Sequence, residues 1–336
     1  MIRLAINGFG RIGRNVVRAL YENPSFGSSM EIVAINDLSD IKSMAHLLKH
    51  DSVHGFFPHD VEIEDNMIKV SKSPIKIFQE RNPENLPWDE MDVDVVMECT
   101  GLFTARSDAE KHIKAGAKKV LISAPGKDVD RTVVYGVNDW SLKKDDVIVS
   151  NASCTTNCLA TILKVLNDNF VVNKGTMTTI HSYTGDQSIV DTYHKDLYRA
   201  RAGAMSMIPT TTGAATAIGD VIPDLKGKMN GFAMRVPTPN VSFVDLVCEL
   251  GRDVSVEDII ETMEKESQKR LKETLGFNNE KLVSIDFNHS PFSAVFDANQ
   301  IYKIDNLYKI TAWYDNEWGF SNRMLNVAKL MASKES

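Results

Sequence analysis

Cys154 is the residue whose type and setting most strongly suggest covalent chemistry. It lies in Ser150-Asn-Ala-Ser-Cys-Thr-Thr-Asn157, between an expected strand at 147–149 and an expected amphipathic helix at 155–168. At a helix N-terminus the helix dipole is expected to stabilise a thiolate and so to lower the thiol pKa. The thiolate is the nucleophilic form of cysteine, so this position suits covalent catalysis. A buried structural cysteine is the alternative interpretation.

A cysteine nucleophile needs a base close by, and the chain has eight histidines. His181 ends the β-like run Met177-Thr-Thr-Ile-His181, and the ends of strands at the edge of a domain often carry catalytic groups. We therefore expect His181 to be the partner of Cys154, although the pattern leaves a structural role equally open. The remaining cysteines fit apolar patterns and are expected in the core, with a Cys154–Cys158 redox pair as a weaker alternative; they are Cys99, Cys158 and Cys248.

A glycine-rich turn, Gly8-Phe-Gly-Arg-Ile-Gly13, follows an expected strand at 3–7 and opens a helix. Such glycines permit close approach of the backbone to a pyrophosphate, and the helix N-terminus offers it N–H groups. Asp37, 24 residues after Gly13, follows the next expected strand, where it can bind ribose hydroxyls and repel a 2′-phosphate. The sequence therefore predicts a dinucleotide site that favours NAD over NADP. A tight turn with a surface aspartate is the alternative.

The expected helices and strands that position these residues follow two different patterns, one before and one after residue 150. Up to residue 150, short apolar strands alternate with helices, which predicts a doubly wound parallel sheet of the Rossmann type. Its expected strands are 3–7, 31–35, 67–70, 74–78, 93–98, 118–123 and 147–149, with a helix at 104–115. After residue 150, longer β-like runs predict an α+β domain with a mixed or antiparallel sheet. Its expected strands are 176–182, 229–236, 241–250, 295–302 and 307–315, with helices at 209–220, 255–273 and 318–333.

The length of 336 residues suggests two domains, and the composition is that of an ordinary globular protein. A net charge of −7 argues against a dedicated nucleic-acid surface, and the apolar stretches are too short for a membrane helix. Four cysteines do not make a disulfide framework. We expect a cytoplasmic protein with reduced thiols, no metal, and no dedicated nucleic-acid or membrane binding.

Several motifs, in order along the chain, carry a resemblance to a known family. They are Asn7-Gly-Phe-Gly-Arg-Ile-Gly-Arg14, the Cys154 octapeptide, His181-Ser-Tyr-Thr184, Pro209-Thr-Thr-Thr-Gly-Ala-Ala215, Arg235-Val-Pro-Thr-Pro239 and Trp313-Tyr-Asp-Asn-Glu-Trp318. The chain closely resembles the phosphorylating (type I) glyceraldehyde-3-phosphate dehydrogenases. The resemblance implies oxidation of D-glyceraldehyde 3-phosphate to 1,3-bisphosphoglycerate with NAD and inorganic phosphate, in glycolysis or gluconeogenesis. The reaction would run through a hemithioacetal and a thioester on Cys154, with His181 as the base.

The resemblance also implies the remaining site residues. For NAD they are Gly8, Gly10, Arg11, Ile12, Gly13, Asp37, Arg81, Ser123 and Asn316. For the substrate phosphate they are Thr184, Arg199 and Arg235, and for the attacking phosphate they are Ser153, Thr155, Thr212 and Gly213. Any one of the threonines could instead be a cap or turn residue.

By the same resemblance, residues 1–152 form the NAD-binding domain, completed by a C-terminal helix at 317–336, and residues 153–316 form the catalytic domain. A homotetramer is implied, in which the loop at 181–207 packs near a neighbour's cofactor. Thr192-Tyr193 and Tyr198 in this loop depart from common members, so the strictness of NAD over NADP stays open.

Two other functions stay as alternatives. Erythrose-4-phosphate dehydrogenase shares the Ser-Cys-Thr-Thr-Asn stretch, and Tyr193-His194 resembles its loop, whereas Thr211-Thr-Gly-Ala-Ala215 favours the glyceraldehyde-phosphate enzyme. A non-catalytic dinucleotide-binding regulator is possible because a fold does not determine a function. Such a protein would not need the set of Cys154, His181 and Arg235.

Overall fold

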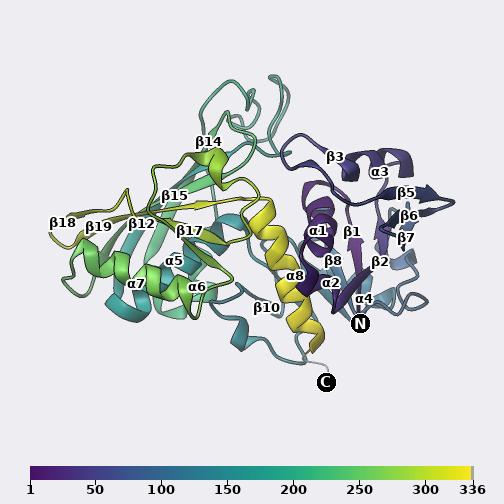
Figure 1. Cartoon of the computed structure of the whole chain (residues 1–336), viewed down its shortest axis with the longest axis horizontal. Coiled ribbons are helices and arrows are strands. Elements are labelled where there is room, and N and C mark those ends of the chain that lie inside the picture. Colours follow the sequence, from purple (N-terminus) through teal and green to yellow (C-terminus); the bar gives the residue numbers. More distant parts are fainter. Residues whose placement is uncertain (334–336) are drawn as a thin grey trace. The chain divides into compact units, whose positions relative to one another are not determined.

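The computed structural model describes residues 1–333, so residues 334–336 of the expected C-terminal helix lie outside the described part. The chain divides into two compact units. The first comprises Met1–Val133, Asp139–Ala152 and the residues from Ser321 onward, and the second comprises Val134–Asn138 and Ser153–Phe320. Each unit has its own sheet, and each is described by itself below (Figure 1).

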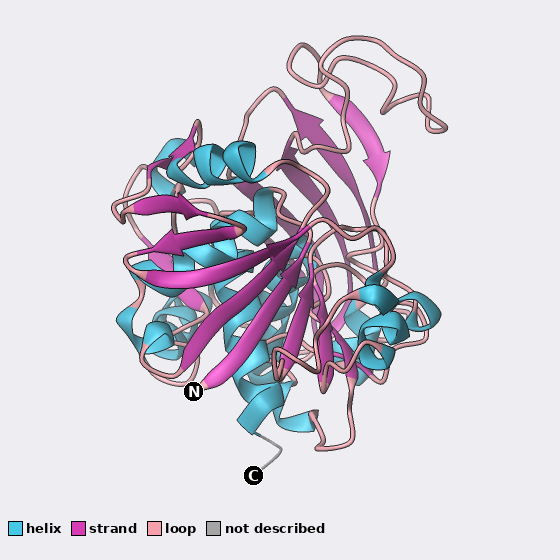
Figure 2. Ribbon diagram, turned by 90° about the vertical axis from the view of Figure 1, so that its right-hand side faces the viewer, coloured by secondary structure: helices cyan, strands magenta, loops and turns pink. Residues whose placement is uncertain are grey.

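The first unit is built on a nine-stranded sheet in the order β10-β11-β9-β8-β1-β2-β7-β6-β5. The strands from β10 to β7 are parallel, and β6 and β5 add an antiparallel edge. Figure 2 shows neighbouring strands fanned by the twist of the sheet. The strands are β1 (Ile2–Asn7), β2 (Met30–Asn36), β5 (Val61–Glu64), β6 (Met67–Val70), β7 (Ser73–Phe78), β8 (Val95–Glu98), β9 (Lys119–Ile122), β10 (Arg131–Thr132) and β11 (Ile148–Ser150). The predicted doubly wound sheet is confirmed.

The helices of this unit cover the sheet because each has an apolar face. In α1 (Arg11–Glu22), Val16, Val17 and Leu20 are buried, at the spacing of a helix that packs on a sheet. The other helices are α2 (Pro24–Gly27), α3 (Ile41–Lys49), α4 (Arg106–Lys114) and most of α8 (Trp318–Ser333), with short 3₁₀ turns at Pro83–Asn85 and Asp139–Ser141 and a small hairpin of β3 (His50–Asp51) and β4 (Gly55–Phe56).

The second unit has a mixed sheet in the order β13-β14-β12-β15-β19-β17-β16, with β18 paired to β19. Parallel pairs join β12 to β14 and β16 to β17, and the remaining pairs are antiparallel. The strands are β12 (Val172–Ser182), β13 (Ile208–Thr211), β14 (Met229–Val236), β15 (Ser242–Leu250), β16 (Leu275–Asn278), β17 (Ala294–Asp297), β18 (Tyr302–Ile304) and β19 (Leu307–Tyr314). The predicted mixed-sheet domain is confirmed.

Helix α5 (Cys154–Phe170) packs on this sheet through a continuous apolar face that includes Cys158, Ile162 and Leu166. The other helices are α6 (Ile218–Val221), α7 (Val256–Gln268) and 3₁₀ turns at Pro223–Leu225 and Ser284–Phe287. Within residues 1–333 no helix combines the length and the apolar character needed to cross a membrane.

Three predicted elements differ from the observed ones. The predicted helix at 209–220 is wrong, because Ile208–Thr211 pairs antiparallel with β14 and helix is confined to Ile218–Val221. The β-branched Thr210 and Thr211 favour an extended edge strand, which outweighs the apolar spacing of the segment. The predicted strand at 295–302 breaks after Asp297, where a turn leads into β18, and the helix expected at 255–273 ends at Gln268.

Candidate active site

Cys154 is the first residue of α5, and the hydroxyl of Ser153 caps this helix. Ser153 Oγ accepts a hydrogen bond from Thr156 N at 3.0 Å and lies 2.8 Å from Thr156 Oγ1. Cys154 is partly exposed, whereas Cys158, one turn later, is fully buried. The fold therefore presents Cys154 at the helix N-terminus and confirms Cys158 as a core residue.

His181 meets Cys154 at the end of β12, with 3.6 Å between His181 Nε2 and Cys154 Sγ. The parallel pairing of β12 with β14 places Arg235 directly beside His181. Arg235 Nη1 lies 2.8 Å from His181 Nδ1 and donates to the carbonyl oxygen of Ser182 at 2.9 Å. A thiol, an imidazole and a guanidinium thus converge at the carboxyl ends of two neighbouring strands.

Burial governs the protonation of this cluster. It raises the pKa of the Cys154 thiol, against the opposing effects of the Arg235 charge and of hydrogen bonds at Thr155 and the helix backbone. The expectation of a lowered thiol pKa is therefore wrong in its net direction, because desolvation outweighs the electrostatic help. Burial, followed by the charge of Arg235, lowers the pKa of His181 to about 3, while the Ser182 carbonyl acts in the other direction. Burial therefore disfavours both charged forms, the Cys154 thiolate and the His181 imidazolium.

Tyr314 is a member of the site that sequence reasoning missed. Its hydroxyl lies 2.8 Å from both Thr155 Oγ1 and Thr179 Oγ1, and its ring meets the ring of His181 edge-on at 5.9 Å. Burial, with the nearby Cys154 and Cys158, raises the pKa of Tyr314 well above its usual value, so the phenol stays protonated. A signal was present, since Tyr314 ends a β-like run as His181 does.

The hydroxyls expected at the attacking-phosphate site make hydrogen bonds within the protein. Ser153 Oγ is the helix cap, Thr155 Oγ1 bonds Tyr314, and Thr212 Oγ1 accepts from Ala214 N at 3.2 Å. A Cβ added to Gly213 would have no other atom within 4 Å, so the space beside this residue is open. Ser153 and Thr212 therefore have the cap and turn roles that the sequence left open, whereas Thr155 makes a tertiary contact to β19.

The residues expected beside the substrate phosphate fall into two groups. Arg235 adjoins His181, as described. Arg199 instead pairs with Asp186, lies 3.4 Å from Asp196 and donates to Thr210 Oγ1 at 3.0 Å. Thr184 N donates to Gln187 Oε1 at 3.2 Å. Arg199 is thus neutralised by carboxylates of its own loop, and Arg235 is the cation next to the reactive pair.

In the first unit, the glycine turn lines a cleft of about 460 Å³ together with Asp37, Arg81 and Thr100. Gly8 has φ +94°, and a Cβ there would lie 2.7 Å from Thr100 N. A Cβ on Gly13 would lie 2.2 Å from Gly8 O, so β1 and α1 could not pack as closely. At Gly10 the space is open, which leaves the N-terminus of α1 accessible to an anion. The lining thus combines a helix N-terminus with a carboxylate, groups that suit a pyrophosphate and a ribose.

Asp37 follows β2, where its carboxylate accepts from Phe9 N at 2.7 Å and from the N–H and hydroxyl of Ser39. Burial alone would raise the pKa of Asp37, but these hydrogen bonds and the charge of Arg14 together lower it. An ionised carboxylate at this position can accept from ribose hydroxyls. Asp37 thus places an ionised carboxylate after β2, beside the glycine turn.

The other residues expected at the dinucleotide site lie nearby in the same unit. Arg11 and Ile12 are in the first turn of α1, and Arg11 forms an ion pair with Asp51. Arg81 is an exposed residue of the cleft lining. Ser123 follows β9, and its N–H donates to the carbonyl oxygen of Glu98 at 2.9 Å.

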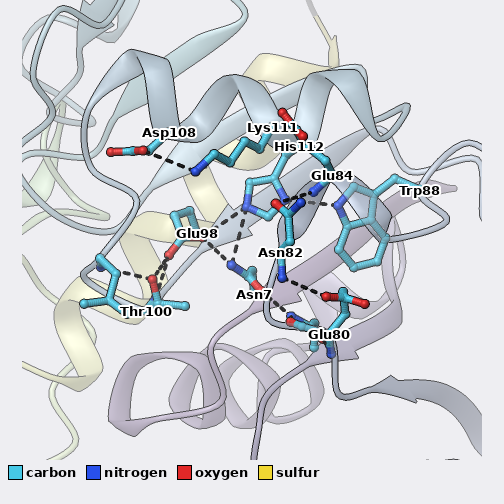
Figure 3. A network of polar contacts seen from close by, with 12 residues as sticks. Asn7, Glu80, Asn82, Glu84, Trp88, Glu98, Thr100, Asp108, Lys111 and His112 are labelled. Carbon is cyan, nitrogen blue, oxygen red and sulfur yellow. Dashed lines mark hydrogen bonds and ion pairs between the residues drawn. The ribbon is translucent and has the colours of Figure 1, made fainter.

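A buried polar network lies beneath the cleft (Figure 3). Glu98, at the end of β8, accepts from Asn7 Nδ2 at 2.6 Å and from Thr100 N at 2.8 Å. His112 lies between Glu98 and Trp88, with its Nε2 3.1 Å from Glu98 Oε2 and its Nδ1 3.1 Å from Trp88 Nε1. The network fixes the ends of β1 and β8, which line the cleft. No motif in the sequence marks Glu98 or His112.

Comparison with known proteins identifies the family. The model described as the NAD binding domain of glyceraldehyde 3-phosphate dehydrogenase matches residues 2–106, and the model of its C-terminal domain matches residues 153–316. The chain belongs to the glyceraldehyde-3-phosphate dehydrogenase family. Proteins of that name from Cereibacter sphaeroides and Geobacillus stearothermophilus are 56% identical over 331 residues and 53% identical over 335 residues, covering 98% and 99% of each chain. The resemblance drawn from the motifs is confirmed.

Asn316, in the second unit, is the remaining residue that the family pattern assigns to NAD. Its Oδ1 accepts from the hydroxyls of Ser182 at 2.8 Å and Ser242 at 2.9 Å. Because both serines donate to the oxygen, the orientation of the amide is fixed. In the described part of the chain, no group of three or more His, Cys, Asp or Glu side chains could hold a metal ion.

Proposed function

We propose that this protein is an NAD-dependent phosphorylating aldehyde dehydrogenase that oxidises D-glyceraldehyde 3-phosphate to 1,3-bisphosphoglycerate. The observation that carries the proposal is the cluster in which Cys154 Sγ lies 3.6 Å from His181 Nε2 with Arg235 at the opposite ring nitrogen. Membership of the glyceraldehyde-3-phosphate dehydrogenase family supports the assignment of this substrate. A non-catalytic binding protein would not need such a cluster, and relatives of more than 50% identity carry the glyceraldehyde-3-phosphate name rather than that of the four-carbon enzyme.

The chemistry starts with a proton transfer between the two central side chains. His181 Nε2 takes the thiol proton of Cys154, Sγ attacks the aldehyde carbon, and the imidazolium returns the proton to the new oxygen to give a hemithioacetal. His181 then takes the hydroxyl proton while the carbon is oxidised to a thioester. NAD, when bound, supplies the hydride acceptor. Inorganic phosphate attacks the thioester carbon, the C–S bond breaks, and the Cys154 thiolate recovers its proton from His181.

We propose that two groups of residues hold the phosphates. Arg235, with Thr184 and Arg199, binds the phosphate of the aldehyde, because a guanidinium suits phosphate oxygens. The attacking phosphate is held by Ser153, Thr155, Thr212 and Gly213, through hydroxyl and backbone N–H groups. Since Arg199 is already paired with Asp186, we assign the larger share of the substrate phosphate to Arg235.

NAD is proposed to bind through the glycine turn, Asp37 and the cleft they line. The full set is Gly8, Gly10, Arg11, Ile12, Gly13, Asp37, Arg81, Ser123 and Asn316. The N-terminus of α1 suits the pyrophosphate, and Asp37 suits the ribose. On this proposal residues 1–152 with the C-terminal helix form the NAD-binding domain, and residues 153–316 form the catalytic domain.

We further propose a cytoplasmic homotetramer. The loop at 186–207 exposes many large apolar side chains, among them Ile189, Tyr193 (93% exposed), Leu197, Met205 and Met207. Contiguous exposed apolar residues are typical of interaction surfaces, and the family loop packs against a neighbour. Four free thiols suit a reducing compartment.

An initial-rate comparison tests the proposed activity. The full-length protein is assayed with glyceraldehyde 3-phosphate or erythrose 4-phosphate and NAD, with and without inorganic phosphate. We expect the three-carbon aldehyde to be preferred and NADH formation to depend strongly on phosphate. Preference for the four-carbon aldehyde, or turnover indifferent to phosphate, would contradict the proposal.

A further inference from the structure

Two histidines lie close together on the surface of the first unit, at the end of α3. His46 is in the last turn of the helix, and His50 follows the helix as its C-cap residue. The backbone N–H of His50 donates to the carbonyl oxygen of His46, which holds the two residues one turn apart. Their ring centres are 4.9 Å apart, the ring planes are inclined by 45°, and both residues are exposed. The fold thus holds two imidazoles side by side in an exposed position.

The rings of His46 and His50 have aromatic neighbours instead of polar partners. His50 lies 5.7 Å from the ring of Phe56, and in the part of the chain that the structure describes no hydrogen bond or ion pair reaches either imidazole. At His59, in the same unit, Nδ1 instead lies 3.0 Å from Ser71 Oγ. A neutral imidazole carries a lone pair on one ring nitrogen and is the commonest metal ligand among side chains. Two such lone pairs are therefore available at the end of α3.

The spacing of the two rings fits a shared metal ion. Two imidazoles bound to one ion have ring centres about 4.5–5.2 Å apart, because each metal–nitrogen bond is about 2.0–2.1 Å long and the bonds meet at an angle between a right angle and a tetrahedral one. The observed 4.9 Å lies within this range. Histidines four residues apart on a helix also share one face, the arrangement of helical two-histidine zinc motifs. His46 and His50 can therefore ligate one ion after a small rotation of the rings.

The charges at the end of α3 decide which ion suits the pair. A helix C-terminus carries partial negative charge, which favours a cation, whereas Lys49 opposes it from the same turn, with its Nζ 5.8 Å from the centre of the Phe56 ring. The carboxylate of Asp51 is engaged elsewhere, because it pairs with Arg11 and accepts from two backbone N–H groups. A donor set of imidazoles without a carboxylate suits Cu²⁺ best, and Ni²⁺ and Zn²⁺ less well.

We propose that His46 and His50 form a surface site for a divalent transition-metal ion, Cu²⁺ in preference to Ni²⁺ and Zn²⁺, with water completing the coordination shell. The site lies in the first unit and takes no part in the proposed oxidation of the aldehyde. A bound ion joins the last turn of α3 to β3, and the next residue of β3, Asp51, pairs with Arg11 in the first turn of α1. Metal binding therefore stabilises the folded first unit.

The test uses full-length protein whose accessible thiols have been alkylated with iodoacetamide, so that sulfur does not compete for the metal. Calorimetric titration with NiCl₂ gives the affinity, and electron paramagnetic resonance with one equivalent of CuCl₂ gives the number of nitrogen ligands. The wild-type copper spectrum should show splitting by two imidazole nitrogens. His46→Gln and His50→Gln should each weaken Ni²⁺ binding by at least about tenfold and remove one nitrogen from the copper spectrum.

His59→Gln is the matched control, because His59 is a histidine of the same unit whose Nδ1 already contacts Ser71. This variant should bind Ni²⁺ as the wild type does. Since His46 and His50 are exposed, their variants should match the wild-type urea midpoint without metal, and Ni²⁺ should raise the midpoint of the wild type and of His59→Gln alone. Wild-type affinity in either His46→Gln or His50→Gln, or an equal loss of affinity in His59→Gln, would overturn the site.

Discussion

His112 and His181 are both buried, at 0% and 4% exposure, and their surroundings are opposite. At His112 the indole N–H of Trp88 can only donate, so Nδ1 must accept and Nε2–H must donate to Glu98. At His181 the demands at Nδ1 conflict, and Nε2 faces a sulfur. A hydrogen-bond partner at each ring nitrogen fixes one histidine as a structural element, and Asn7 Nδ2, 3.4 Å from Nε2, donates to Glu98 at the shorter distance of 2.6 Å. An inconsistent set leaves the other able to exchange protons.

The comparison extends to the groups around each ring. Glu98 accepts from Asn7, His112 and both the N–H and the hydroxyl of Thr100, so a buried carboxylate is satisfied by four donors (Figure 3). Such a network is rigid because each loss would leave a buried polar atom without its partner. The Cys154 cluster instead holds the Arg235 guanidinium 2.8 Å from His181 Nδ1, and the charge of Arg235 disfavours an imidazolium there.

The largest expected effect comes from replacing each histidine by asparagine. His181→Asn should lower kcat by about 10²–10⁴, the contribution of a general base, with little change in stability. His112→Asn should cost about 2–4 kcal/mol of unfolding free energy, because Trp88 and Glu98 lose a buried partner, while kcat falls little. Steady-state kinetics and urea unfolding of both variants measure this. Equal losses of activity in the two would break the contrast.

The second largest effect is expected in the way the His181 contribution to stability depends on pH. His181 has a folded pKa of about 3 against 6.5 for an unperturbed histidine, so the unfolded chain binds its proton first. Stability contributed by neutral burial is therefore complete above pH 6.5 and declines as the pH falls toward 3. The His181 contribution should fall by up to about 1.4 kcal/mol per pH unit. Urea midpoints of wild type and His181→Asn should be similar near neutral pH and separate as the pH falls, with wild type becoming the less stable, and parallel curves would contradict it.

A smaller effect is expected from Trp88→Phe. The variant removes the donor that fixes His112 Nδ1, so the orphaned acceptor should cost about 1–3 kcal/mol, with a further contribution from the cavity. Trp140→Phe, at a 79% exposed tryptophan, is the matched control and should leave the urea midpoint unchanged. The rate of Cys154 alkylation should not respond to either variant. A normal midpoint for Trp88→Phe would mean that the hydrogen bond does not fix His112.

The smallest expected effect comes from Tyr314→Phe. Because Tyr314 touches His181 through its ring edge, the variant should leave the His181 tautomer unchanged. Loss of the hydroxyl leaves Thr155 and Thr179 with one partner fewer, at a cost of about 1 kcal/mol. Unfolding curves and side-chain nitrogen spectra check the two parts. A changed tautomer would give Tyr314 a direct part in positioning the base.

The sequence predicted what depends on local pattern. The strand ending at Ser150 and the helix beginning at Cys154 follow from apolar spacing and place the thiol at a helix N-terminus. The contact between His181 and Arg235 depends on the pairing of β12 with β14. These strands are separated by the 46 residues between Ser182 and Met229, and hydrophobic periodicity does not specify which strands pair. Only the family resemblance assigned both residues to one active site.

The sequence did not predict the properties that depend on burial in the tertiary structure. The predicted direction of the Cys154 pKa shift is wrong, because the sequence reveals a helix N-terminus but not the desolvation of the thiol. Thr210 and Thr211 were assigned to a helix because the edge of β14 that they pair with lies downstream. The Glu98–His112–Trp88 network has no sequence signature, because its members come from a strand, a helix and a loop that only the tertiary fold brings together.

The most direct test of the account is to trap the acyl group. Full-length protein is mixed with glyceraldehyde 3-phosphate and NAD without inorganic phosphate, quenched in acid, digested and weighed by mass spectrometry. The account predicts a 3-phosphoglyceroyl thioester on the peptide that contains Cys154, lost when phosphate is added before the quench. An acyl group on Cys99, Cys158 or Cys248, or no adduct despite NADH formation, would contradict it.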